Sequence, residues 1–527
     1  MSALTGTRHL TRLAFRLDRL RLPVWVLAIA LLPMATAAQY KQLYPTKADL
    51  DSVRAVLSTP ALVAIGGPLF RVSLGGLTAW KIMSTELILI GLMSLLTVVR
   101  HTRTEEETGR LELISAGVVG RHAPLTAALV TAGLADLVAG ALAALFLLAT
   151  GLPATGSLAL GLAVCVTGLA FAAIAAVAVQ LTENARTAIA IAGAVLAGSY
   201  LLRAVGDTGP TWLSWLSPLG WAIHIRAYAG ERWWVAGLAV ALAALLAALA
   251  YTLAGRRDVG AALLAQRPGP AMAAAGLRSP FGLAWRLHRG LLAGWLFGMA
   301  VAGAALGGAA SALTDQIAVN QELTDMLARL GGSKGVTDGY LGAVFGIVGL
   351  VVACYTVQAT LRLRAEESAG RLEPLLATRT GRVRWALSHL VFAVVGSALL
   401  LAAAGAAGGL AYGAQISDVG GQVPRLLGAA MVQLPAAWVL AGLGVALFGL
   451  VPQATPLTWV ALVACLVLLE LGALLNLSRW IVDASPFAHV PKLPGAEFSA
   501  TPVLWLTAVA VVLAAAGLVG FRRRDIG

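Results

Sequence analysis

The chain has 527 residues, of which 59% are hydrophobic and only 12% are charged, and its mean hydropathy is +0.83. These values exclude a soluble globular protein. The net charge of +13 would suit a nucleic-acid-binding protein, but the basic residues lie at the ends of apolar runs and not in a separate basic domain with interleaved aromatic residues. The positive charge therefore indicates membrane topology and contact with anionic lipid, and we expect no nucleic-acid partner.

Residues 8–21 form the first predicted element. At helical spacing they place four leucines on one face and four arginines on another. This pattern is typical of an amphipathic helix that lies at the membrane interface. A helical extension of the first span is the alternative, but Pro23 should separate the two segments.

About twelve apolar runs follow, each near 20 residues long and rich in Ala, Leu, Val and Gly. A helix of this length crosses a bilayer, and it satisfies its own backbone hydrogen bonds in lipid. The runs lie at 23–39, 76–98, 123–150, 157–181, 188–204, 233–255, 290–312, 341–361, 385–413, 425–450, 457–476 and 501–521. The sequence therefore predicts an all-α polytopic membrane protein with six spans in each half.

Three connecting segments are long enough to hold structure of their own. Residues 40–75 and 313–340 should form short helices outside the membrane. Residues 205–234 are rich in tryptophan, which prefers the lipid headgroup level. We interpret this segment as an interfacial or re-entrant element, with a substrate gate as the functional alternative.

The distribution of basic residues predicts the orientation of the chain. Of its 38 lysines and arginines, 25 lie in the segments 1–22, 99–122, 182–187, 256–289, 362–384 and 522–527. Short loops rich in positive charge remain in the cytoplasm. Both termini should therefore be cytoplasmic in a cell membrane, and the two halves should form a parallel repeat.

An internal duplication supports this arrangement, because five landmarks recur in the same order. Residues 13–17 match 283–287, 59–67 match 324–332, 103–112 match 364–373, 217–218 match 485–486, and 257–260 match 524–527. We therefore divide the chain into a first six-helix half at 1–260, a cytoplasmic linker at 261–280 and a second six-helix half at 281–527.

The landmark with the most charge reads RTEEETGRLE at 103–112 and RAEESAGRLE at 364–373. As a helix, the first copy would place Glu105, Gly109 and Glu112 on one face and would pair Glu106 with Arg110 across one turn. A glycine weakens a helix, so its recurrence suggests the close approach of another backbone. The task predicted for this segment is to dock a partner, and a solvated charged loop is the alternative.

In this motif the sequence resembles the permease subunits of ABC-type exporters of the type-2 class, which carry a Glu-Glu-x-x-Gly-x-Leu-Glu pattern in their first cytoplasmic loop. The resemblance implies a coupling helix that contacts a separate ATPase, present in two copies and carrying ATP and Mg²⁺. The residues that match the family pattern or flank it are Glu105, Glu106, Gly109, Arg110, Leu111 and Glu112, and in the second half Glu366, Glu367, Gly370, Arg371, Leu372 and Glu373.

The fused two-half layout resembles most the branch that exports polyketide antibiotics and other drugs. Hydrophobic or amphiphilic compounds are therefore the expected substrates. Pro374 replaces the first half's Leu113, so the second coupling helix should be kinked or shorter. Export of a lipid or a polysaccharide remains the alternative within the exporters.

The residues themselves argue against an ATP site in this chain. A phosphate-binding loop needs Gly-Lys followed by Ser or Thr, and none of the five lysines follows a glycine. We therefore expect a transport subunit and not an enzyme, with no cofactor of its own. No histidine spacing indicates a metal site. An ion-coupled secondary transporter remains the rival, and a membrane-embedded enzyme is a weaker one.

Three carboxylates inside the predicted spans are candidates for a substrate path: Glu86, Asp136 and Glu470. Such groups are costly in a membrane and should face the protein interior. Each would either hydrogen-bond to a neighbouring helix or lie along the route of the substrate. The repeat positions of Glu86 and Asp136 are Ile347 and Ser397, so any path would be asymmetric.

Overall fold

The computed structural model describes residues 2–46, 50, 54, 57, 60–258, 260–263, 271–319, 332–471 and 478–525. The chain divides into two compact units, Met1–Gly269 and Pro270–Gly527, with a boundary inside the segment predicted as the linker. Every regular element among the described residues is a helix. Eleven of these helices are long and apolar enough to cross a membrane, which confirms the prediction of an all-α polytopic membrane protein.

The described part of unit 1 contains seven long or amphipathic helices and four short ones. They are α1 (Thr7–Leu17), α2 (Arg21–Leu43), α4 (Pro60–Gly66), α5 (Leu74–Val99), α6 (Glu105–Glu107), α7 (Arg110–Ser115), α8 (Ala123–Ala149), α9 (Ala154–Leu181), α10 (Ala185–Thr208), α11 (Pro218–His224) and α12 (Trp234–Ala254). Helix α9 is central, because it packs against α5, α8, α10 and α12. Small residues allow this: a Cβ on Gly140 of α8 would lie 2.3 Å from the carbonyl oxygen of Gly161 on α9.

Unit 2 is built from α13 (Pro280–Val319), α15 (Gly332–Thr360), α16 (Arg362–Ser368), α17 (Leu372–Leu376), α18 (Arg382–Gln415), α19 (Val419–Met431), α20 (Leu434–Leu450), α21 (Leu457–Leu471), α22 (Arg479–Val482) and α23 (Ala500–Arg523). Its closest helix pairs are α13 with α18 and α20 with α23. Glycines on both pairs bring the backbones together, as they do in unit 1.

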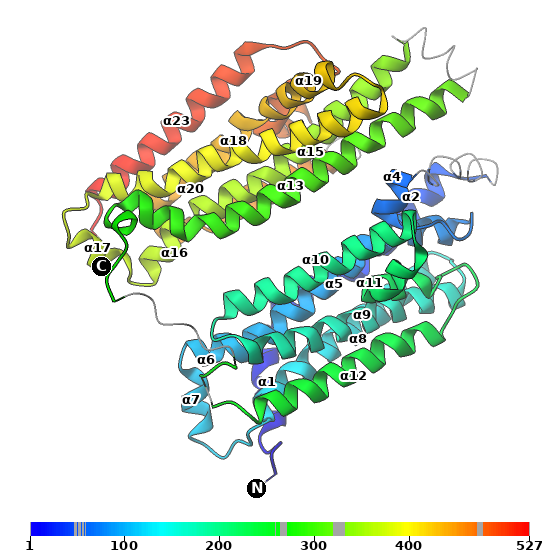
Figure 1. Cartoon of the computed structure of the whole chain (residues 1–527), viewed down its shortest axis with the longest axis vertical. Coiled ribbons are helices and arrows are strands. Elements are labelled where there is room, and N and C mark those ends of the chain that lie inside the picture. The colour runs from blue at the N-terminus through cyan, green and yellow to red at the C-terminus, as the bar shows by residue number, and fades with distance from the viewer. Residues whose placement is uncertain are drawn as a thin grey trace. The chain divides into compact units, whose positions relative to one another are not determined.

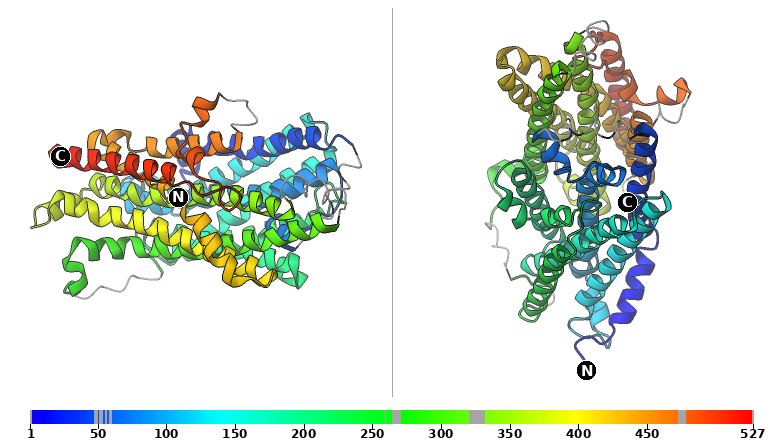
Figure 2. Two further views of the ribbon diagram at one scale, coloured as in Figure 1. Left: turned by 90° about the horizontal axis from the view of Figure 1, so that it is seen from above. Right: turned by 90° about the vertical axis from the view of Figure 1, so that its right-hand side faces the viewer.

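Both units have the same internal plan (Figure 1). Their long helices run side by side, also in the two turned views (Figure 2). In unit 1, α6 and α7 lie at one end of the bundle and α4 and α11 at the other. In unit 2, α16 and α17 lie at one end, next to the C-terminus. The short charged helices therefore mark one end of each bundle.

The structure differs from the predicted elements at three places. The break after the amphipathic helix lies at residues 18–20 and not at Pro23, which is tolerated in the first turn of α2. In unit 2 there is no such break, since α13 runs through 280–319 as one helix. The predicted span 457–476 corresponds to α21, which is shorter than the other spanning helices in its described part.

The tryptophan-rich segment 205–234 forms no membrane-crossing helix. It folds into a 3-10 turn at Thr211–Leu216 and the short helix α11, with Trp212 and Trp234 exposed. The position of this segment at the membrane interface stays a prediction. Of the predicted outer helices, α4 lies in 40–75, whereas most of 313–340 falls outside the described residues.

Candidate functional site

The two acidic motifs form bent segments, which we call the first elbow (residues 100–115) and the second elbow (residues 361–377). In the first elbow, a π-helical turn at Arg100–Thr104 continues α5 into α6, and the chain then turns into α7. The turning residue is Gly109, with φ 71°, and in the second elbow Gly370 has φ 67°. Side chains rarely adopt this left-handed conformation, so glycine is required by the backbone.

This geometry gives the glycines a reason that does not depend on a partner. No non-adjacent atom of the described chain lies within 4 Å of the point where a Cβ on Gly109 or Gly370 would stand. The glycines are therefore present for the turn and not for the close approach of another backbone within this chain. Helix α17 has five residues against six in α7, but the two helices end at equivalent positions, Leu376 and Ser115, so the one missing residue lies before Pro374.

The predicted pair of Glu106 with Arg110 is wrong, and the equivalent residues Glu367 and Arg371 do not pair either. Because the chain turns at the glycine between them, the two residues no longer share a helical face. Arg110 instead lies 3.5 Å from Glu105.

In the second elbow, Arg371 Nε lies 2.7 Å from Glu366 Oε2. This hydrogen bond is the largest of the effects that raise the pKa of Arg371 above its ordinary value. The second carboxylate of each motif, Glu106 or Glu367, is thereby left for other partners.

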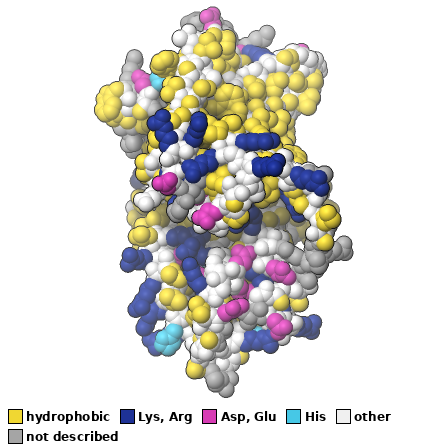
Figure 3. Space-filling model, turned by 90° about the vertical axis from the view of Figure 1, so that its left-hand side faces the viewer, with side chains coloured by type: hydrophobic (Ala, Val, Ile, Leu, Met, Phe, Trp, Pro, Cys, Tyr) yellow, Lys and Arg dark blue, Asp and Glu magenta, His cyan; other side chains and the backbone are white. Residues whose placement is uncertain are grey.

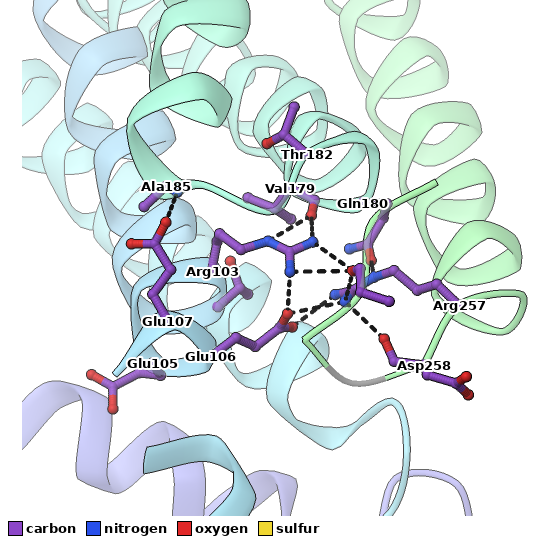
Figure 4. Close-up of polar contacts among 12 residues, drawn as sticks. Arg103, Glu105, Glu106, Glu107, Val179, Gln180, Thr182, Ala185, Arg257 and Asp258 are labelled. Atoms are coloured by element: carbon purple, nitrogen blue, oxygen red, sulfur yellow. Dashed lines mark hydrogen bonds and ion pairs between the residues drawn. The ribbon is translucent and has the colours of Figure 1, made fainter. Parts of the chain in front are cut away.

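Glu106 lies between two arginines in a buried cluster (Figure 4). Arg257, just after the end of α12, makes two hydrogen bonds to it, of 2.7 Å to Oε1 and 3.0 Å to Oε2. Arg103 bonds to Oε2 from the other side. Arg103 is wholly buried and also donates to the carbonyl oxygens of Val179 (3.2 Å) and Ala261 (3.3 Å). We call Arg103, Glu106 and Arg257 the first ion triad.

A second ion triad in unit 2 repeats this arrangement. Arg364 Nη1 lies 2.9 Å from Glu367 Oε2, and Arg524 Nη2 lies 2.5 Å from Glu367 Oε1. Arg524 follows α23 as Arg257 follows α12. The repeated landmark at 257–260 and 524–527 therefore supplies one arginine to each triad, Arg257 or Arg524, which we call the distal arginine. Its sequence alone did not indicate this contact.

The first elbow has one further attachment. Glu107 Oε1 accepts a hydrogen bond of 2.6 Å from the backbone N–H of Ala185, the first residue of α10. An acceptor with negative charge satisfies an otherwise free donor there and interacts favourably with the helix dipole. Ser368 stands at the repeat position of Glu107.

The elbow residues separate into an inner and an outer set. Leu111 and Leu372 point inward, and Leu372 belongs to the apolar core of unit 2. Among the described side chains of α7 and α17, and of the residue directly before each, the exposed ones are Arg110, Glu112, Leu113, Arg371, Glu373 and Pro374. Leu113 is 80% exposed. Figure 3 views this end of each unit, where basic and acidic side chains gather. The outer set therefore forms a charged tip with an apolar centre.

A buried acidic residue ties the start of the chain to the first elbow. Asp18, between α1 and α2, lies 3.0 Å from Arg100 Nε and 2.7 Å from His101 Nε2. Burial alone would raise the pKa of Asp18, but the hydrogen bond with His101 and the charges of His101, Arg100 and Arg21 hold it below its ordinary value. No motif in the sequence marks Asp18 for this role.

The predicted substrate-path residues have different surroundings. Glu86 on α5 is wholly buried, and neither carboxylate oxygen has a hydrogen-bond partner among the described residues. Asp136 on α8 is also buried, 2.5 Å from Ser94 Oγ and against the backbone of Gly168. Glu470 lies on α21, but its side chain lies outside the described part. Within the described ranges, no three His, Cys, Asp or Glu side chains come together as metal ligands would.

Comparisons with known proteins identify the family. Residues 277–522 match the family described as the C-terminal domain of the multidrug efflux system permease Rv1217c. The whole chain is similar to the multidrug efflux system permease protein Rv1217c of Mycobacterium tuberculosis. The two are 45% identical over 528 residues, which cover 100% of this chain and 96% of the relative. With its spanning helices and its repeated elbows, the chain belongs to the family of multidrug efflux system permeases.

Proposed function

We propose that this permease is the membrane part of an ATP-driven exporter, and that a separate ATPase, in two copies, docks on the two elbows. The observation that carries the proposal is the repeated charged tip. Each unit presents the same kind of short helix, after the same glycine turn, at one end of its bundle. A matched pair of tips suits a partner that is itself present twice.

The outer set of elbow residues defines what the partner must offer. Glu112 and Glu373 are exposed carboxylates, and Leu113 and Pro374 next to them are exposed apolar groups. A complementary surface would carry arginine or lysine around an apolar pocket. In this proposal Glu106 and Glu367 do not touch the ATPase, because they are occupied inside their own units.

The elbow ends are assigned to the cytoplasm. The N-terminal segment lies at this end of unit 1, since the N–H of Gly120 donates to the carbonyl oxygen of Thr5 at 2.9 Å. The C-terminal segment lies at this end of unit 2, since Arg382 donates to the carbonyl oxygen of Arg524 at 2.6 Å. Together with the excess of basic residues in the same loops, this supports two cytoplasmic termini.

The energy source and the substrate complete the proposal. ATP and Mg²⁺ would bind to the partner, since no lysine of this chain follows a glycine. The substrates would be several hydrophobic or amphiphilic drugs, such as polyketides; the similar protein of Mycobacterium tuberculosis is a multidrug efflux system permease. Among the candidate acidic residues, Glu86 is best placed to contact a cationic drug. Its buried carboxylate oxygens have no hydrogen-bond partner among the described residues.

Purification of the tagged chain from its host in mild detergent tests the docking. We expect a stoichiometric ATPase to co-purify with the wild-type chain. The double variant Glu112→Lys with Glu373→Lys should lose this ATPase, because a positive charge replaces the exposed negative one on each tip. Glu497→Lys is the matched control, since Glu497 is exposed before the start of α23, the end of that helix opposite the elbow. Equal recovery of the ATPase with all three proteins would contradict the proposal.

An ion-coupled transporter is the second candidate, and the burial of Glu86 favours it. A buried carboxyl that has no hydrogen-bond partner among the described residues is the kind of group that takes up and releases a proton in such transporters. The chain would then move drugs in proteoliposomes under a proton gradient without ATP. Glu86→Gln should abolish that activity, whereas Asp136→Asn would leave it if Asp136 serves only to bond Ser94.

A further inference from the structure

The two ion triads share a detail beyond their three members. Arg121, just before α8, donates to the carbonyl oxygen of Arg257 at 2.9 Å. Arg382, at the start of α18, donates to the carbonyl oxygen of Arg524 at 2.6 Å. Arg121 and Arg382 are separated by the same 261 positions as Gly109 and Gly370. The contacts of the distal arginine are therefore repeated on both its side chain and its backbone.

These contacts join parts of each unit that are far apart in the sequence. Arg103 comes from the π-helical end of the second span, Glu106 from the elbow, and Arg257 from the segment after the last span. In unit 2 the same three places are joined by Arg364, Glu367 and Arg524. One carboxylate in each unit thus connects the elbow with the ends of two spanning helices.

The connection in unit 1 is stiff for physical reasons. Arg257 holds both oxygens of Glu106, and its Nε also donates to Gln180 at 2.6 Å. A paired guanidinium and carboxylate with two bonds resist rotation more than a single contact does. The side chains are 9% and 6% exposed, so water offers little competition, and separating them would leave buried charge unpaired.

We propose that Glu106 and Glu367 are positioning residues that lock each elbow to the end of the last span, so that displacement of an elbow by its partner is transmitted to α12 and α23. The inference rests on the proposed function, because the partner that displaces the elbow is the ATPase. In this scheme the triads transmit the movement, and the outer set of elbow residues docks the ATPase.

The distal arginines provide the test, because each has an arginine neighbour as a matched control. Arg256 and Arg523 directly precede Arg257 and Arg524 and are exposed. The permease is purified with its ATPase and reconstituted. Drug transport and ATP hydrolysis are then measured for Arg257→Ala, Arg524→Ala, Arg256→Ala and Arg523→Ala. The measured quantity is the drug moved per ATP hydrolysed.

We expect Arg257→Ala to lower this ratio about tenfold while the ATPase still co-purifies and hydrolyses ATP, a size typical of coupling between sites. Arg524→Ala should lower it less, since the Arg524 side chain is 18% exposed. The two control variants should keep the wild-type ratio. Arg257→Lys should give an intermediate ratio, because an ammonium group keeps the charge but not both bonds to Glu106.

Two outcomes overturn the inference. A wild-type ratio in Arg257→Ala shows that the triad transmits nothing. A loss of ATPase binding in Arg257→Ala, but not in Arg256→Ala, shows that the arginine supports docking instead. If Arg257→Ala does not fold, Glu106→Gln replaces it, with the same expectation and the same contrary results. A wild-type complex without ATP-dependent transport refutes the proposed function itself, which separates that failure from failure of the linkage.

Discussion

The two elbows contain the same ion pairs in different surroundings. In unit 1 the proximal arginine, Arg103, is wholly buried and bonds to two backbone carbonyl groups in addition to Glu106. In unit 2 the side chain of its counterpart, Arg364, is 36% exposed. Glu107 also reaches α10, whereas Ser368 stands at its repeat position. The first elbow is therefore the more firmly anchored one, although the charged motif is nearly identical.

The corner before the first span differs as well. In unit 1 Asp18 joins Arg100 and His101. Its repeat position, at the offset of the 13–17 landmark, is His288, which lies 3.0 Å from His389 on α18. Asp18 thus links the start of unit 1 to its elbow, whereas the equivalent residue of unit 2, His288, pairs with another histidine. The two units therefore share the triads but not the supports around them.

Removal of the proximal arginine should give the largest difference between the units. Arg103→Ala leaves Glu106 with one partner fewer and leaves two carbonyl groups without their donor, so we expect a loss of about 3–5 kcal/mol in unfolding free energy. Arg364→Ala should cost about 0.2–1 kcal/mol, because its pair with Glu367 is partly exposed. Thermal unfolding of the purified variants measures both, and equal losses would remove the asymmetry.

Replacement of the turning glycines should give equal effects in the two units. Gly109→Ala and Gly370→Ala place a Cβ on a left-handed residue, which costs about 1–2 kcal/mol. There is open space around both positions, so no steric clash adds to this cost. Gly237→Ala in α12 is the control, because it also meets open space but has helical backbone and should stabilise the protein slightly. A larger loss at only one elbow would show that its turn carries additional strain.

The smallest effect is expected from the acidic corner. Since the pKa of Asp18 is lowered in the folded protein, its contribution is complete above the unfolded value of about 3.9 and is lost as the pH falls through the folded value. Asp18→Asn should cost about 1 kcal/mol at pH 6 and progressively less below pH 4. Unfolding temperatures of both proteins between pH 3 and pH 6 measure this. A constant difference over that range would show that the charge of Asp18 is irrelevant.

The sequence was sufficient for the spanning helices because their signal is local. A run such as 123–150 carries its own hydropathy, and α8 occupies Ala123–Ala149. The pairing of Glu106 was not predictable in this way, since its partner Arg257 is 151 positions away. The spacing of Glu106 and Arg110 favoured a pair that the turn at Gly109 prevents. The repeated landmark at 257–260 contained the missing information, but a repeat shows only that residues are kept together and not what they contact.

The glycines between the helices of unit 2 have a consequence for how that unit can deform. A Cβ on Gly303 or Gly307 of α13 would lie 2.2 or 2.3 Å from backbone carbonyl oxygens of α18, and Gly449 and Gly517 bring α20 and α23 equally close. Surfaces that fit backbone against backbone cannot slide by a fraction of a turn without collision. Each helix pair should therefore move as one rigid body. A displacement of Arg524 would then move α20 together with α23.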